Sequence, residues 1–259
     1  MKVVVCVKQI PDPATPGRLD PESCTLARDG RLVLDDADAG GVEVALRLLD
    51  ALGGGEMVLV CMAPRGETGG LRAALAMGAD RAILVSDEAL AGSDALGTAK
   101  VLAAAVRGEA PDLVVAATES TDGYTGTTPV QVAELLGLPS VTFATRVEVG
   151  DGTVRVERRT DTGLDEVECP LPAVVTVGAG AVEPRYPSFS GVVAARSKPI
   201  DRRSVADLGL SAAEVGWAGA RQEITEVGAV AGRRAGVVVE DRGDAHERII
   251  EFLDQLHVI

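Results

Sequence analysis

The sequence predicts an α/β protein: a parallel, Rossmann-like sheet with an antiparallel hairpin insert and an extended C-terminal arm. In the first half of the chain, short β-branched runs alternate with apolar stretches of helical period. Between residues 140 and 170 the apolar period falls to two, and turn residues separate the runs. Beyond residue 203, large apolar side chains are sparse until a last amphipathic stretch.

The alternation in the first half implies right-handed crossovers and a parallel sheet that helices cover on both faces. The expected strands of this sheet are residues 2–7, 57–62, 82–85, 113–117 and 173–177. The expected helices follow the acidic run 35–38 or span residues 65–77, 94–107 and 129–136. The hairpin insert is expected to contain strands 141–149, 153–159 and 164–169. The polar residues 14–33 are expected to be irregular, with a small hairpin near residues 24–33.

Composition excludes several classes of function. A net charge of -14 argues against a general nucleic-acid binder, which needs a basic face. The 4 cysteines form no C-x-x-C pair, and His246 and His257 both lie near the C-terminus, so neither a metal centre nor a histidine triad is indicated. No apolar run reaches transmembrane length, and the chain opens with a strand, so we expect a cytoplasmic protein.

The stretch from 113 to 139 is the main candidate site. A buried strand is followed by the Gly- and hydroxyl-rich loop 118–128, and then by a helix with Pro129 at its first position. Thr128 is the expected N-cap, and Gln131 would complete a capping box. Free backbone N–H groups at such a helix start favour a phosphate. The alternative is a Thr-rich surface turn, and neither a Walker A motif nor G-x-G-x-x-G is present.

Other residues are expected at the same edge of the sheet, because ligands of parallel sheets lie at the carboxyl ends of the strands. Cys6 and Lys8 end the first strand, and Met62 ends the second.

The C-terminal segment is expected to be an arm. Residues 185–203 carry a net charge of +4 beside an apolar run around Phe189, which either packs on its own domain or binds a partner. Residues 204–243 suit an extended connection, and residues 244–256 form an amphipathic helix with a capping-box pattern at its start. We therefore expect a nucleotide-binding domain at 1–184 and a recognition loop and arm at 185–259.

Five stretches, in this order, carry a family resemblance. They are residues 5–12, 71–81, 119–139, 158–176 and 183–189. Over nearly its whole length the chain resembles the β subunit of electron-transfer flavoprotein. The resemblance implies an adenine-nucleotide hydrolase-like sheet, a heterodimer with an α subunit, a redox FAD held mainly by that α subunit, and a structural AMP in the β subunit.

The resemblance also implies the site residues. Around AMP it places Cys6, Asp35, Asp36, Ala37, Asp38, Met62, Ala117, Thr118, Glu119, Ser120, Thr121, Asp122, Gly123, Tyr124, Thr125, Gly126, Thr127 and Thr128. Pro13 and Ala37 fall where members approach the flavin. For partner recognition it implies Tyr186, Phe189, Val192 and Val193.

The chain also departs from the family pattern. Asp35-Asp36 stands where Asn-Pro is frequent, and Phe189 stands where a Leu anchor is common. The loop lacks the Asp-Thr-Ala-Gln-Val-Gly-Pro run that resembles electron-bifurcating members, in which a second FAD replaces AMP. AMP is therefore favoured over a second flavin.

Three interpretations of function compete. The favoured one is an electron-carrier subunit, not an enzyme, that passes electrons from flavin dehydrogenases, such as acyl-CoA dehydrogenases, toward a membrane quinone oxidoreductase. The second is a component of a flavin-based electron-bifurcating complex. The third is an unrelated nucleotide-binding domain of stress-protein or ATP-pyrophosphatase type, which would leave the arm and the hairpin insert unexplained.

Overall fold

The computed structural model describes residues 1–228, 236, 238 and 240–258. The chain divides into two compact units, Met1–Thr225 and Glu226–Ile259. Within the described residues, no helix combines the length and the apolar composition that crossing a bilayer requires.

The first unit is built on one large, mostly parallel sheet. Over the described residues its strand order is β11-β5-β4-β1-β6-β10-β7-β8-β9. Neighbours from β11 to β7 pair in parallel, and β7, β8 and β9 pair antiparallel. The strands are β1 (Lys2–Cys6), β4 (Glu56–Met62), β5 (Arg81–Val85), β6 (Leu113–Ala117), β7 (Ser140–Gly150), β8 (Thr153–Thr160), β9 (Gly163–Pro170), β10 (Ala173–Val177) and β11 (Ile200–Arg203). This confirms the predicted α/β class and the hairpin insert.

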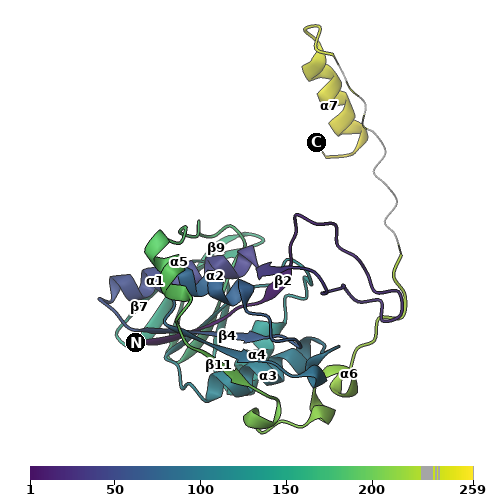
Figure 1. Cartoon of the computed structure of the whole chain (residues 1–259). Helices are drawn as coiled ribbons and strands as arrows, with labels where there is room; N and C mark the ends of the chain where they lie inside the picture. Colours follow the sequence, from purple (N-terminus) through teal and green to yellow (C-terminus); the bar gives the residue numbers. More distant parts are fainter. Residues whose placement is uncertain (229–235, 237, 239, 259) are drawn as a thin grey trace. The chain divides into compact units, whose positions relative to one another are not determined.

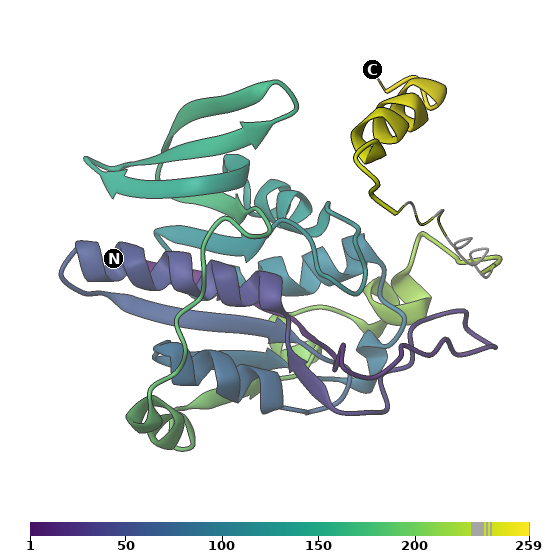
Figure 2. The same cartoon turned by 90° about the horizontal axis from the view of Figure 1, so that it is seen from above.

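Helices cover both faces of the sheet (Figures 1 and 2). They are α1 (Asp36–Ala51), α2 (Gly69–Met77), α3 (Ala95–Arg107), α4 (Thr128–Leu136) and α5 (Phe189–Ala195), with the 3-10 turn η1 (Glu88–Leu90) before α3. Side chains of β1 alternate between two cores: Val3 and Val5 pack with α1 and α2, whereas Val4 packs with α3 and α4. The central strands are buried on both faces, which explains their continuous apolar composition.

Two expectations in the first 80 residues need correction. The small hairpin expected near residues 24–33 lies earlier in the chain, as an antiparallel bridge between Leu19 and Leu26, whereas β3 (Leu32–Leu34) bonds antiparallel to β2 (Gln9–Pro11). The second helix begins at Gly69 rather than Arg65. Its start is set by Gln9, which accepts a hydrogen bond from Gly70 N at 2.8 Å and donates one to Glu67 O at 2.8 Å.

The segment after residue 184 stays with the first unit as far as Thr225. The loop expected around Phe189 is in part the helix α5, which Ser188 caps by accepting a hydrogen bond from Gly191 N at 3.0 Å. The expected extended connection instead begins with short helical turns. They are η2 (Ala206–Leu208), η3 (Ala212–Glu214) and α6 (Gly216–Gly219). The rest of that connection falls partly on residues 229–235, 237 and 239, outside the described residues.

Several cations of the predicted basic patch at 185–203 form ion pairs or hydrogen bonds within the first unit. Arg185 pairs with Glu43 at 2.7 Å, Lys198 donates to Ala79 O at 2.5 Å, and Arg203 lies 3.5 Å from the carboxylate of Glu109. These cations join the segment to its own domain, because carbonyl and carboxylate oxygens of that domain satisfy their donors.

The second unit contains α7 (Ala245–Gln255). The predicted amphipathic helix is confirmed, and its large apolar residues are exposed: Ile249, Ile250, Phe252 and Leu256. The expected capping box does not form, because the Asp244 side chain makes no cap bond and Glu247 N donates to the Asp244 backbone oxygen.

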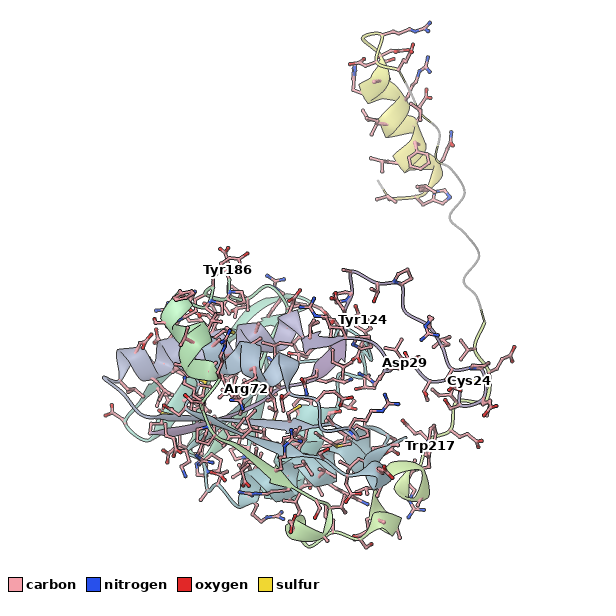
Figure 3. The ribbon with its side chains drawn as sticks, in the orientation of Figure 1. Cys24, Asp29, Arg72, Tyr124, Tyr186 and Trp217 are labelled. Carbon is pink, nitrogen blue, oxygen red and sulfur yellow. The ribbon has the colours of Figure 1, made fainter. Side chains whose placement is uncertain are left out.

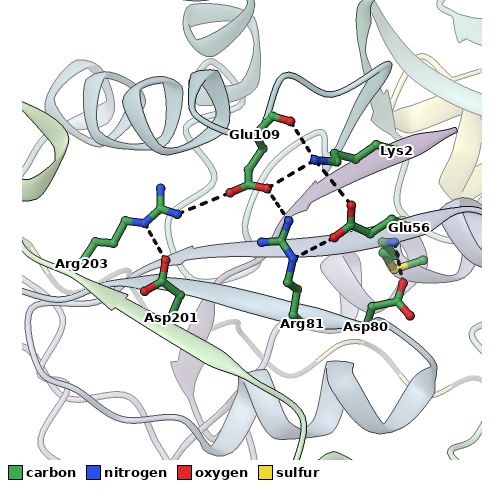
Figure 4. Close-up of polar contacts among 8 residues, drawn as sticks. Lys2, Glu56, Asp80, Arg81, Glu109, Asp201 and Arg203 are labelled. Carbon is green, nitrogen blue, oxygen red and sulfur yellow. Dashed lines mark hydrogen bonds and ion pairs between the residues drawn. The ribbon is translucent and has the colours of Figure 1, made fainter.

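An ion-pair network closes the amino-terminal edge of the sheet (Figure 4). At its centre is Glu109, which follows α3 and has a side chain only 7% exposed. Its carboxylate binds Arg81 of β5 and lies 3.5 Å from Arg203 of β11. Arg81 also reaches Glu56 of β4 at 2.8 Å, and Lys2 of β1 lies 3.5 Å from the same Glu56. The first residues of β1, β4 and β5 are therefore joined at this edge, and Arg203 reaches the network from the last position of β11.

Candidate functional site

The candidate site lies at the opposite, carboxyl-terminal edge of the sheet. The chain order reverses beside β1, which has β4 on one side and β6 on the other. In open parallel sheets such a switch point leaves a crevice for ligands. The loop 118–128, between β6 and α4, lies at this edge, as the sequence predicted.

The Asp35 side chain binds the loop 118–128 through hydrogen bonds. It is fully buried and is the N-cap of α1, where its side chain accepts a hydrogen bond from Ala37 N at 3.1 Å. It also accepts hydrogen bonds from Thr121 N at 2.8 Å and Thr121 Oγ1 at 3.0 Å. Both carboxylate oxygens are thus engaged within the chain. Asp35 therefore fixes the position of the loop through contacts within the chain.

Asp122 is the second carboxylate that fixes the loop. Its side chain is 6% exposed, and it binds Lys8 Nζ at 2.6 Å and the Arg28 guanidinium. Burial alone would raise the pKa of Asp122, but Lys8 and Arg28 outweigh burial and hold that pKa below its ordinary value. Lys8 Nζ also donates to Ser120 Oγ at 3.1 Å. The loop, β1 and the long segment 12–31 meet at this cluster.

Asp38 lies nearby and is 6% exposed. It accepts a hydrogen bond from Lys8 N at 2.6 Å. Burial, and then the neighbouring Asp35, raise its pKa to about 8. Burial also raises the pKa of the Cys6 and Cys61 thiols to about 12, so both are neutral at ordinary pH. Their environment suits packing rather than thiolate chemistry.

The start of α4 differs from the prediction by one residue. The N-cap is Thr127, not Thr128, and Pro129 lies in the first turn as expected. No side chain caps the first N–H groups, and Gln131 Nε2 instead donates to Thr127 Oγ1 at 3.4 Å. The predicted capping box is therefore wrong. Gln131 Oε1 is buried and, within the described residues, has no hydrogen-bond partner.

An open cleft of about 460 Å³ lies between the starts of α3 and α4. The residues that line it are Asp94, Ala95, Leu96, Thr125, Thr127, Gln131, Arg221 and Gln222. At the start of α3, Asp94 accepts hydrogen bonds from Gly97 N at 2.7 Å and from Arg221 N at 2.7 Å. A smaller apolar cavity of about 20 Å³ lies against Cys6, Thr128 and Pro129.

The structure separates the predicted site residues into groups. Those that line the cleft are Thr125 and Thr127. Those that line the small cavity are Cys6 and Thr128. Those whose side chains bond within the chain are Asp35, Asp38, Thr118, Ser120, Thr121 and Asp122. Those at element ends are Asp36, Ala37, Met62 and Ala117, and those along the loop are Glu119, Gly123, Tyr124 and Gly126.

Two loop residues have left-handed backbone conformations. Gly126 has φ +64°, which glycine adopts readily, whereas Tyr124 has φ +48° and is 67% exposed. Tyr124 is labelled in Figure 3. Strained non-glycine backbone is concentrated at functional sites in proteins.

Sequence reasoning missed four residues of this edge. They are Arg28, Asp94, Gln131 and Arg221. Gln131 could have been found, because it lies three residues after the end of the loop, but it was assigned to a capping box. The others come from distant segments, and no local pattern indicates them.

The predicted recognition residues are gathered at α5 and the turn before it. Tyr186 is 94% exposed and Phe189 87% exposed, and Val192 and Val193 are also exposed. Figure 3 shows Tyr186 projecting from the surface. The backbone of α5 lies tightly on α2, because a Cβ at Gly191 would be only 2.5 Å from Ala76 O. The apolar side chains therefore point to solvent from a firmly seated helix.

Comparisons with known proteins agree with this architecture. The electron transfer flavoprotein domain model matches residues 23–208. Electron transfer flavoprotein subunit beta of Mycobacterium leprae is 37% identical, over 97% of each chain, and that of Thermoanaerobacterium thermosaccharolyticum is 32% identical, over 100% of each. The caffeyl-CoA reductase-Etf complex subunit CarD of Acetobacterium woodii is 35% identical, over 82% of this chain and 81% of the relative. The chain therefore belongs to the electron transfer flavoprotein family, among its beta subunits.

Proposed function

We propose that the chain pairs with an electron transfer flavoprotein α subunit in the cytoplasm and carries electrons. The donors are flavin dehydrogenases, such as acyl-CoA dehydrogenases, and the acceptor is a membrane quinone oxidoreductase. The chain is a carrier subunit rather than an enzyme. The observation that carries this proposal is the likeness to beta subunits along the whole chain, which covers the sheet, the hairpin insert and the C-terminal arm alike.

The cleft fits a nucleotide such as AMP. Its volume of about 460 Å³ is sufficient for a small-molecule ligand. Gln131 Oε1 is a buried acceptor that a ribose hydroxyl or an adenine amino group would satisfy. The first turn of α4 has no side-chain cap, so its N–H groups suit a phosphate. Thr125 and Thr127 would add hydroxyl donors from the loop.

The chain's contribution to electron transfer is binding and orientation. FAD, held mainly by the α subunit, supplies the redox chemistry when bound. The exposed apolar side chains at α5, led by Phe189, would enter a pocket of the dehydrogenase. The residues from 185 on would serve partner binding, and the apolar face of α7 would pack on the α subunit, since such a face is unfavourable in water.

Cofactor counting tests this proposal directly. The chain would be purified together with the α subunit of the same organism, and the nucleotides released by denaturation would be counted. One FAD and one AMP per heterodimer are expected. A preparation without AMP would contradict the nucleotide assignment, and a chain that does not pair with the α subunit would contradict the proposal as a whole. Truncation before Asp244 should weaken the pairing.

A bifurcating complex is the alternative, and one observation favours it. CarD, at 35% identity, is named as a subunit of a caffeyl-CoA reductase-Etf complex. Two FAD and no AMP per heterodimer would support this alternative. The loop Tyr124-Thr-Gly-Thr-Thr-Pro129 argues for AMP, because it lacks the run that resembles bifurcating members.

A further inference from the structure

The segment 215–222, here called the strap, lies near the C-terminal end of the first unit in sequence, and its last two residues line the cleft. Three backbone donors join it to the residues before α3. Trp217 N donates to Ala91 O at 2.9 Å, Gly216 N donates to Ser93 Oγ at 2.8 Å, and Arg221 N donates to Asp94 Oδ2 at 2.7 Å. The strap is therefore bonded along its length to the β5–α3 connection.

Close packing fixes the strap as firmly as its hydrogen bonds do. Gly216 has φ +59°, and a Cβ there would lie 2.0 Å from Ala89 O. A Cβ at Gly92 would lie 2.1 Å from the Trp217 ring, and Val215 is fully buried. Trp217 is labelled on α6 in Figure 3. Because both sides of this contact need glycine, the backbone of Arg221 is held in place without a ligand.

This placement brings one positive side chain to the cleft wall. Of the described residues that line the cleft, Arg221 is the one cation, and it lies with Thr125, Thr127 and Gln131 in that lining. Lys8 and Arg28, the other cations near the loop, are both bound to Asp122. Within the described lining of the cleft, Arg221 is therefore the one cation that can meet an anion.

Asp94 also lines the cleft, and its carboxylate carries a negative charge that the Arg221 guanidinium must outweigh before an anion can bind. The two oxygens of Asp94 accept hydrogen bonds from the N–H groups of Gly97 and Arg221. Burial would raise the pKa of Asp94, but these hydrogen bonds keep that pKa below its ordinary value. Asp94 thus acts as the N-cap of α3 and the anchor of the strap.

We propose that Arg221 binds the phosphate of the nucleoside monophosphate in this cleft, opposite the uncapped first turn of α4. This inference rests on the proposed AMP site and adds a ligand from the strap, far along the chain from the loop 118–128. A guanidinium forms charge-assisted, often bidentate hydrogen bonds with phosphate, whereas the loop supplies only neutral donors. The strap would therefore make the site selective for the phosphorylated nucleoside.

Binding of AMP and of adenosine to the heterodimer tests the proposal. Equilibrium dialysis would use heterodimer stripped of nucleotide, with wild type, Arg221→Ala and Arg221→Lys. Arg221→Ala should weaken AMP binding about ten- to hundredfold and leave adenosine binding within about twofold, because only the charged contact is lost. Arg221→Lys should recover part of the AMP affinity. Arg146→Ala, on the exposed β7–β8 hairpin, is the matched control and should change neither.

The outcomes separate this inference from the proposed function. If wild type binds neither ligand, the AMP site itself is wrong. If wild type binds AMP and Arg221→Ala binds it equally well, Arg221 is not a phosphate ligand. Equal weakening of AMP and adenosine would also overturn the inference, because it would show that Arg221 only supports the strap. Thermal melts of each variant check that it is folded. If the alanine variant does not fold, Arg221→Gln replaces it in the comparison.

Discussion

At both edges of the sheet, a buried carboxylate binds two cationic side chains, but the surroundings of the two carboxylates differ. At the amino-terminal edge, Glu109 joins strands through Arg81 and Arg203, and the network is complete. At the carboxyl-terminal edge, Asp122 joins the loop to Lys8 and Arg28 in a similar way. At the second edge there are also an open cleft and a buried acceptor, Gln131 Oε1, that has no donor among the described residues. Buried carboxylates stabilise both edges, but the cleft and its unsatisfied polar atom distinguish the edge at which we propose that a nucleotide binds.

The largest expected effect is that of Asp35→Ala. The substitution removes the N-cap of α1 and leaves the Thr121 N–H and hydroxyl without their acceptor in a buried position. We expect the free energy of unfolding to fall by about 3 kcal/mol, of which the cap accounts for about 1. AMP content should fall as well, because the loop loses its anchor. Chemical denaturation and nucleotide extraction measure the two effects, and full AMP retention would contradict the role of Asp35 in the site.

Glu109→Ala is the matched change at the other edge. It leaves Arg81 and Arg203 without their shared carboxylate, in a partly buried setting. We expect a loss of about 2 kcal/mol, less than for a fully buried pair because the arginines retain some hydration. AMP content should not change. A loss of AMP in this variant would show that the two edges are coupled and would break the comparison.

A pH series distinguishes Asp38 from Asp122. The folded pKa of Asp38 is raised to about 8, so the folded state keeps a proton that the unfolded state releases, and stability should fall as pH rises from about 4 to about 8. Asp38→Asn should flatten this slope, by at most about 1.4 kcal/mol per pH unit. The pKa of Asp122 is lowered, so its contribution is present above the unfolded pKa and is lost as pH falls through the acid range. Denaturation at pH 3, 5, 6.5 and 8 compares the slopes in the two ranges, and an unchanged slope above pH 5 in Asp38→Asn would contradict the assignment.

Phe189→Ala should have the smallest effect on stability. Because the side chain is 87% exposed, the change in the free energy of unfolding should stay within about 0.5 kcal/mol. Reduction of the heterodimer by its dehydrogenase, followed by stopped flow, should be slower if Phe189 anchors in a partner pocket. Leu164→Ala, on the exposed hairpin, is the control for removing a surface apolar group. Normal transfer by Phe189→Ala would rule out the anchor.

The sequence alone determined eight of the nine strands that the described residues form in the large sheet, the hairpin insert, and the place of the loop 118–128. It missed the edge strand β11 (Ile200–Arg203), which was expected to be part of the arm. The strand β10 (Ala173–Val177) has the predicted bounds, and the other sheet strands that were expected begin and end within two residues of their predicted positions. These features follow from local causes: side-chain periodicity, β-branched composition, and glycine or proline at element ends. The loop 118–128 was found for the same reason, since its strand, turn and helix are contiguous in the chain.

Only the tertiary structure decided which side chains complete the site. Gln9 sets the start of α2 from 61 residues away, Arg28 reaches Asp122 across 94 residues, and Arg221 meets Asp94 across 127. Contacts between residues so far apart in the sequence produce no periodic pattern in it. A single hydrogen bond between distant segments does not restrict the residue types beside the two partners. They exist because the fold brings the ends of β1, β4 and β6 to one edge, where buried carboxylates must find donors wherever the chain supplies them.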